Sequence, residues 1–160
     1  MLFSLATPEY TNVQSNTTKV RVHLRSGIAE IFEQHQDLMG KIDNNIIEIE
    51  TNFENKIEKT SFVLQDAVFI VSNEQMNSSD IQGTGVYVYA KRVKEITANL
   101  SLEDISKQYE EKASAFEIEK QKLALENIDP LDQNLNAKLF VLKEEVDFLN
   151  KVVTVVKDFK

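Results

Sequence analysis

The chain has 160 residues, of which 42% are hydrophobic and 28% are charged, a composition typical of a globular protein with one ordinary domain or a small domain and an appendage. Its net charge is −8 and no arginine follows Arg92. Because nucleic acids and anionic membranes attract clustered Lys and Arg, we expect the chain to bind neither. The absence of cysteine excludes disulfides, thiol chemistry and thiolate metal sites.

The first ten residues lack the basic flank and the longer apolar run of a secretory signal. No apolar run further along approaches the roughly 18 residues that a membrane helix needs. We therefore expect a cytoplasmic protein, or one at the cytoplasmic face of a membrane within a larger complex, without direct membrane insertion.

Up to about residue 92, apolar and polar residues alternate as they do in half-buried strands. The clearest stretches are residues 2–5, 20–24, 28–32, 47–50 and 86–90. Phe62 and Leu64 precede Ala67–Val71, an apolar run short enough for a buried strand. Gly27 precedes residues 28–32, where a tight turn would use a positive φ. Several short strands separated by polar turns predict an antiparallel sandwich or barrel. Residues 73–85 are polar and are predicted to form a long hairpin loop.

After Arg92 the period becomes helical. A seam spaced 4-3-4-3-4-3 predicts a long second helix; its members are Leu135, Leu139, Leu142, Val146, Leu149, Val153 and Val156. A weaker seam precedes it and begins at Leu102, with Ser101 and Asp104 placed as in a capping box. Pro130 separates the two helices by a short connection, so they are expected to fold back antiparallel.

The predicted fold class is thus α+β with segregated parts, an N-terminal antiparallel β-sandwich followed by a C-terminal two-helix hairpin. The expected boundaries are 1–92 for the sandwich, 93–101 for a linker and 102–160 for the hairpin. The second helix's seam is expected to pack mainly on the first helix. Because the first helix is polar in its middle, docking of this seam on another subunit is the alternative.

The sequence offers no catalytic, metal or cofactor site. His35 has no neighbouring His, Asp or Glu at the spacing of a metal site, and a structural or interface role is expected for it. Glu48 and Glu50 alternate with isoleucines, which favours a solvated strand face over a carboxylate pair. The Gly83–Gly85 stretch lacks the Lys-Ser/Thr of a phosphate loop.

Three features together resemble the epsilon subunit of F-type ATPases, which is called delta in mitochondria. The first is the order of parts, a sandwich of about 90 residues followed by a helical hairpin. The second is Thr7-Pro8-Glu9 soon after the first strand. The third is the family's signature, Gly-Glu-x-Gly, two apolar residues, then Pro-Gly-His-Ala-Pro-Leu. Its register is kept here by Gly27, Ile31, Phe32, His35 and Leu38.

The resemblance implies a non-catalytic central-stalk subunit that binds a gamma-like subunit and helps couple or regulate ATP turnover in alpha and beta chains. It implies that the signature segment lies at the end of the sandwich that meets the rotor ring and the gamma subunit. The candidate interface residues are therefore Ile31, Phe32, His35 and Leu38. It also implies that the hairpin can reach the alpha and beta subunits. No cofactor is expected, because the hairpin has no arginine for the ATP motif of some family members.

Departures from the signature leave an alternative. Glu30 replaces its second glycine, Glu33 and Gln34 replace Pro-Gly, and Gln36 and Asp37 replace Ala-Pro. In the family this region meets the membrane rotor ring, so the altered side chains favour an F-type-like ATPase without a proton ring that drives other machinery. An alternative of another class is a free-standing coiled-coil adaptor or chaperone that self-associates through the helical seam.

Overall fold

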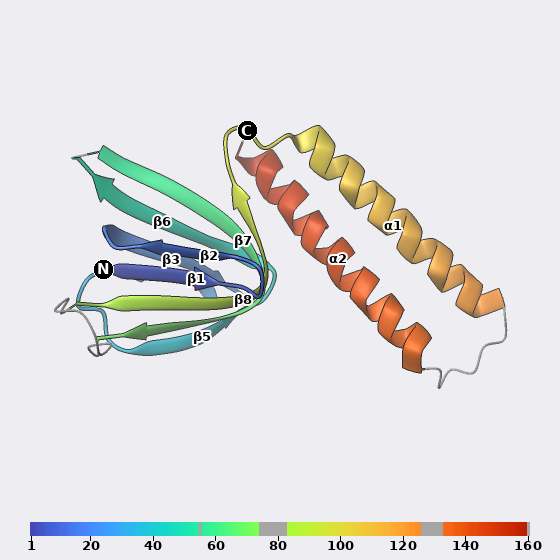
Figure 1. Cartoon of the computed structure of the whole chain (residues 1–160), viewed down its shortest axis with the longest axis horizontal. Helices are drawn as coiled ribbons and strands as arrows, with labels where there is room; N and C mark the ends of the chain where they lie inside the picture. Colours follow the sequence, from blue (N-terminus) through green and yellow to red (C-terminus); the bar gives the residue numbers. More distant parts are fainter. Residues whose placement is uncertain (55, 74–82, 126–132, 160) are drawn as a thin grey trace. The chain divides into compact units, whose positions relative to one another are not determined.

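The computed structural model describes residues 1–54, 56–73, 83–125 and 133–159, with residues 133–135 described by their backbone only. It divides into two compact units, Met1–Ala98 and Asn99–Lys160, which are treated separately below. The strands of the first unit are β1 (Leu2–Ala6), β2 (Thr11–Gln14), β3 (Thr17–Leu24), β4 (Gly27–Ile31), β5 (Leu38–Ile42), β6 (Asn45–Phe53), β7 (Lys56–Ser72) and β8 (Gly85–Ile96). The helices of the second unit are α1 (Leu102–Leu125) and α2 (Gln133–Asp158) (Figure 1).

The strands form the predicted sandwich. One layer has the order β2-β1-β8-β7-β5 and the other has the order β8-β7-β6-β3-β4. Neighbouring strands are antiparallel except β1 and β8, which are parallel. Gly27 has a φ of 139° and closes the β3–β4 turn, as expected from its place in the sequence. Most of the loop predicted over residues 73–85 lies outside the described residues.

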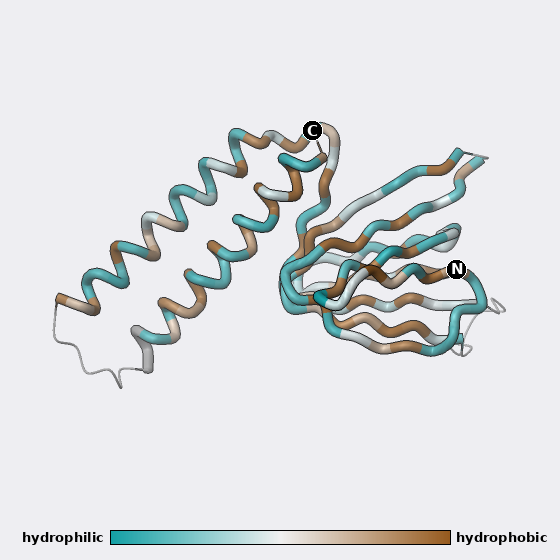
Figure 2. The backbone as a smooth tube through the Cα atoms, turned by 180° about the vertical axis from the view of Figure 1, so that it is seen from behind, coloured by the Kyte–Doolittle hydropathy of each residue, from teal (hydrophilic) through white to brown (hydrophobic). Residues whose placement is uncertain are grey.

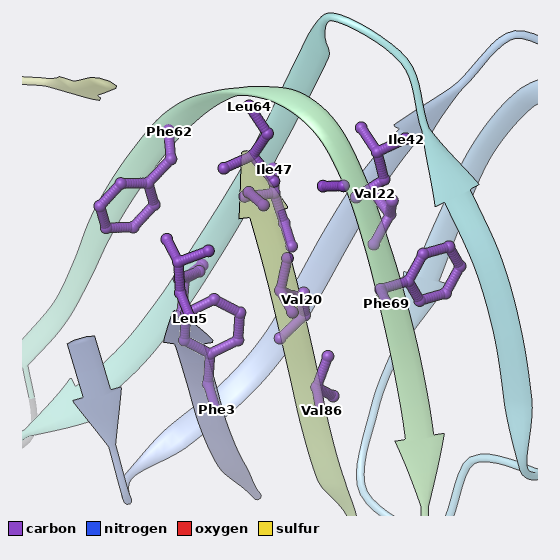
Figure 3. Close-up of a cluster of buried hydrophobic side chains, with 14 of the residues drawn as sticks. Phe3, Leu5, Val20, Val22, Ile42, Ile47, Phe62, Leu64, Phe69 and Val86 are labelled. Atoms are coloured by element: carbon purple, nitrogen blue, oxygen red, sulfur yellow. The ribbon is translucent and has the colours of Figure 1, made fainter. Parts of the chain in front are cut away.

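β7 joins the two layers because it is long enough to belong to both. Its first part pairs with β6 and its last part pairs with β5, in one continuous register. β5 and β6 therefore behave as one strand interrupted between Ile42 and Asn45. At this corner Asn44 and Asp66 have positive φ values of 29° and 47°, which Asn and Asp tolerate better than other non-glycine residues. Figure 3 shows the resulting arch, with Phe62 before the bend and Phe69 after it.

The core consists of the side chains that face between the two layers. Along each strand these alternate with outward-facing residues, which is visible as alternating colours in Figure 2. The largest of the fully buried core side chains are Phe3, Phe62, Phe69, Leu5, Ile31, Ile42, Ile47, Ile49 and Leu64. Gly40 lies opposite Phe69, and its lack of a side chain makes room for the ring.

The second unit is the predicted antiparallel helical hairpin (Figure 1). Ser101 caps α1, since its Oγ accepts a hydrogen bond of 3.2 Å from the Asp104 backbone N–H. In the predicted seam of α2, Val153 and Val156 are buried and the side chains from Leu139 to Leu149 are half-buried, while the side chain of Leu135 lies outside the described residues. Within the described parts of the chain, neither helix is long and apolar enough to cross a membrane.

Candidate partner-binding surfaces

The signature segment divides between the core and the surface. Ile31 ends β4 opposite Val20 and is fully buried, so its side chain belongs to the core. Phe32, the next residue, is 48% exposed, and the Lys19 Nζ lies 5.8 Å from the centre of its ring. Leu38 begins β5 and is 37% exposed. The four candidate residues therefore do not form one continuous surface, and only Phe32 and Leu38 present large apolar side chains to solvent.

A polar network holds the loop of residues 32–37 in place. The Thr84 hydroxyl, which is buried, lies at its centre: it donates to Asn73 Oδ1 and accepts from the Gln34 backbone N–H, both at 2.7 Å. Asn73 Nδ2 in turn donates to the His35 carbonyl oxygen at 2.6 Å and to Asp37 Oδ1 at 3.0 Å. Asp37, at the position of the signature's second proline, thus takes part in the network through its side chain. Gln34, at the position of the signature's glycine before histidine, takes part through its backbone N–H.

Glu33 joins this network from the other side. Its Oε2 lies 2.7 Å from the Met1 ammonium, and its Oε1 accepts a 2.7 Å hydrogen bond from the Thr84 backbone N–H. These two interactions, the ammonium first, lower the pKa of the Glu33 carboxyl below its usual value. A carboxyl with a lowered pKa in the folded state stabilises that state above its unfolded pKa of about 4.3. This stabilisation is lost as the pH falls through the folded pKa, so the loop is expected to loosen in acid.

We expect Thr84→Val to release the loop while the sandwich stays folded. Valine keeps the shape of threonine but removes the hydroxyl shared by Gln34 and Asn73, at a cost of about 1 kcal/mol for each net hydrogen bond lost. Faster hydrogen exchange at the Gln34 amide would report the release. Thr84→Ser keeps the hydroxyl and is the control, and equal exchange in both variants would contradict the role given to the network.

The outer face of the layer that contains β3, β4 and β6 is covered by ion pairs. We call it the charged face, and its residues are Lys19, Arg21, His23, Glu30, Glu48 and Glu50. The Arg21 guanidinium lies 2.7 Å from a Glu30 carboxylate oxygen and 3.2 Å from one of Glu48. Its hydrogen bond to Glu30 lowers the pKa of the Glu30 carboxyl. Because these charges satisfy one another across the strands, the charged face needs no partner to be stable in water.

The outer face of the other layer is different, because apolar side chains lie side by side across β8, β7 and β5. A further one, Val13 of β2, is separated from them by Ser4 of β1. We call it the apolar face, and its residues are Val13, Met39, Val68, Ile70, Tyr87 and Tyr89. Strand register places Tyr87 beside Ile70 and Ile70 beside Met39, and it places Tyr89 beside Val68. Met39 is 71% exposed, Val13 60%, Tyr89 54% and Val68 40%.

The contiguous part of the apolar face spans the three strands β8, β7 and β5, which is about 10 Å at the usual strand spacing of about 4.8 Å. A continuous apolar patch on a soluble protein marks a surface that another macromolecule covers. Sequence reasoning missed it, although a signal was present: Ala67–Val71 is apolar at every position, which is typical of a strand covered on both faces. The run predicts a buried strand, but on its outer side Val68 is 40% exposed.

Two ion pairs fix the register of the hairpin. Lys112 Nζ lies 2.7 Å from Glu145 Oε2, and Lys138 Nζ lies 3.0 Å from Glu119 Oε1. The two pairs are seven residues apart on each helix, in opposite directions, as antiparallel helices require. Hydrogen bonding to Lys138 lowers the pKa of the Glu119 carboxyl, so this pair is intact at neutral pH and is lost as acid protonates the carboxyl.

Charge reversal is expected to test this register. Lys138→Glu places two carboxylates together and should lower the midpoint of thermal unfolding of the helical circular dichroism signal. Adding Glu119→Lys should restore most of the loss, because the pair is remade with its charges exchanged. Lys143→Glu, a reversal on α2 outside these two pairs, is the matched control. If Lys138→Glu lowers the unfolding midpoint no more than the control does, the Lys138–Glu119 pair does not fix the register of the hairpin.

No metal centre accompanies these surfaces: among the residues that the structure describes, no group of three His, Cys, Asp or Glu is placed to hold a metal ion. No protein-family model matches the sequence, and no curated protein matches it. Solved structures do share its fold. A chain of the Euglena gracilis mitochondrial ATP synthase, from a structure of OSCP, F1 and c-ring in rotational state 1, matches with a TM-score of 0.54 and 12% identity. The match covers 94% of this chain and 79% of that one.

A second likeness is to a chain of the Tetrahymena thermophila mitochondrial ATP synthase central stalk and c-ring. It has 11% identity, covers 95% of both chains and has a TM-score of 0.48, too low to carry any conclusion. At 12% identity the Euglena chain shows a shared fold, in which a sandwich and a helical hairpin are joined in one chain of similar extent.

Proposed function

We propose that this chain is a non-catalytic, epsilon-like central-stalk subunit of a rotary F-type ATPase. Three observations support the proposal: the order of sandwich and hairpin, the register of the signature segment, and the fold shared with a chain from an ATP synthase. ATP turnover would take place on alpha and beta chains, and this chain would help couple or regulate it. The protein would work at the cytoplasmic face of the membrane as part of the complex.

The observation that carries the proposal is the apolar face. A sandwich that worked alone would be expected to cover both outer faces with polar side chains, as it does on the charged face. We propose that a gamma-like stalk subunit covers Met39, Val68 and Tyr89, with Phe32 and Leu38 contributing from the end of the sandwich. A stable interface buries about 800 Å² on each partner, so the apolar face would form the centre of the contact and polar residues its rim.

The hairpin has a separate place in the proposal. Its ion-paired register makes it a rigid arm that would reach toward the alpha and beta chains. The basic side chains it offers them are lysines, since no arginine follows Arg92. No regulatory ATP site is proposed in it for the same reason.

Gentle affinity purification of this chain from its native cells, with mass spectrometry of the retained proteins, tests the proposal. Alpha-like and beta-like ATPase chains together with a gamma-like coiled coil are the expected result. Ring subunits in the same sample would indicate an ATP synthase, and their absence a motor without a proton ring. Recovery of the chain as a self-associated oligomer without any ATPase chain would replace the proposal by a free-standing adaptor.

The same purification locates the interface when it is repeated with variants. Val68→Glu and Met39→Glu place a charge in the apolar face and are expected to reduce recovery of the gamma-like chain at least tenfold, as central interface substitutions do. Ile28→Glu is the matched control, because Ile28 is 58% exposed and lies beside His23, on the charged face. Equal recovery with all three variants, each folded by circular dichroism, would move the interface away from the apolar face.

A further inference from the structure

The start of β7 has a partner on only one of its two edges. Lys56–Thr60 pairs with β6, whereas pairing with β8 begins one residue later, where Ser61 lies opposite Ile96. Among the described residues, no strand pairs with the other edge of Lys56–Thr60. This edge therefore presents unpaired backbone N–H and C=O groups, and Ile57 beside them is 67% exposed.

The chain leaves the sheet at the point where this open edge begins. β8 ends at Ile96, a turn follows at Ala98 and Asn99, and Ser101 then caps α1. Thr97, Ala98 and Asn99 are exposed, and Leu100 is half-buried. The connection between the two units is thus a short, mostly solvated segment that starts in line with an unused strand edge.

Continuing the β7–β8 register through this segment gives favourable pairs at both ends. Each β7 residue and its β8 partner keep a constant sum of residue numbers, so the next pairs would be Thr60 with Thr97 and Ile57 with Leu100. Threonine pairs and aliphatic pairs are among those that stabilise antiparallel strands. Between them, Lys59 would face Ala98 and Glu58 would face Asn99, so no like charges meet.

We propose that Thr97–Leu100 is a strand-forming connection that can extend β8 onto the open edge of β7. The extended state gains backbone hydrogen bonds and covers Ile57, and it gives up the turn at Ala98 and Asn99. Four residues at about 3.3 Å each carry the chain about 13 Å further along β7 before α1 begins. The connection therefore has two defined conformations, the turn of this structure and the strand of the extended state. This inference does not depend on the proposed function.

Cysteine cross-linking of the full chain tests the proposal directly, because the native sequence contains no cysteine. The test pair is Ile57→Cys with Leu100→Cys, which face each other only in the extended state. Opposite residues of paired strands have Cα atoms within the range that a disulfide spans. Ser61→Cys with Ile96→Cys, already opposite in this structure, is the positive control. Ile57→Cys with Asn99→Cys is the matched control, shifted by one residue so that the two side chains point to opposite faces.

The expected result is intramolecular oxidation of the Ile57–Leu100 pair at least tenfold faster than oxidation of the Ile57–Asn99 pair. Dilute protein and comparison of monomer bands exclude cross-links between molecules. Equal rates for the two pairs would show random proximity of a loose connection and would overturn the proposal. So would the absence of both cross-links under conditions that oxidise the Ser61–Ile96 pair completely.

Discussion

Ile31→Ala is expected to destabilise the protein by about 2–5 kcal/mol, and Ile31→Asp is expected to prevent folding of the sandwich. The Ile31 side chain faces the core. It lies opposite Val20 at the end of β4 and has no solvent-exposed surface. Alanine leaves a cavity there, whereas aspartate brings a charge into a space that offers it no partner. Urea unfolding followed by circular dichroism and fluorescence would measure both effects.

The neighbouring residue separates a core role from a surface role. Phe32→Asp changes a side chain that is about half exposed, so the free energy of unfolding should change by less than about 1 kcal/mol while any partner contact through the ring is lost. Similar destabilisation by Phe32→Asp and Ile31→Asp would mean that the end of β4 is organised differently from the structure. A stable Ile31→Asp variant would have the same meaning.

Gly40→Val is expected to cost about 3 kcal/mol, near the upper end for overpacking a core. A Cβ at this position would lie 2.5 Å from Cε1 and 2.8 Å from Cζ of the Phe69 ring. Phe69 is completely buried between the layers, so its ring cannot move aside without displacing other core side chains. The free energy of unfolding in urea is again the measurement.

Gly85 provides a comparison in which the same clash distance should have a smaller effect. A Cβ there would lie 2.5 Å from the Tyr87 hydroxyl, but that atom is the end of a side chain on the outer face of the sheet. Gly85→Ala should therefore cost less than Gly40→Ala. Phe69→Leu should partly rescue Gly40→Ala by making room for the new methyl group. A double-mutant cycle in which the two changes in unfolding free energy simply add would contradict the packing described.

The fold class could be predicted because its two parts carry different periods. Strict alternation, as in Val20–Leu24, determines which strand face is buried, and the seam of α2 determines a long helix. Two strands were missed for physical reasons. β2, Thr11–Gln14, is a short edge strand with a single apolar residue, the exposed Val13, and β5, Leu38–Ile42, is interrupted by the glycine that the Phe69 ring requires.

The candidate surfaces could be predicted only in part. The register of the signature segment pointed to Phe32 and Leu38, but the sequence could not show that Ile31 beside them faces inward. The hydrogen bonds that hold the loop at residues 32–37 could not be predicted, because Asn73 and Thr84 are distant from this loop in sequence. The apolar face was missed because its contiguous part exists only once β8, β7 and β5 lie side by side.

The parallel pairing of β1 with β8 dictates an order of assembly. Phe3 lies opposite Val86, so closing this contact brings together segments about 80 residues apart, the kind of non-local contact that slows folding. Because β8 is synthesised much later than β1, β1 stays without this parallel partner until nearly the whole sheet has been made. Until then Leu5 and its neighbours remain open to other chains, and the newly made protein is at its most vulnerable to aggregation before β8 emerges.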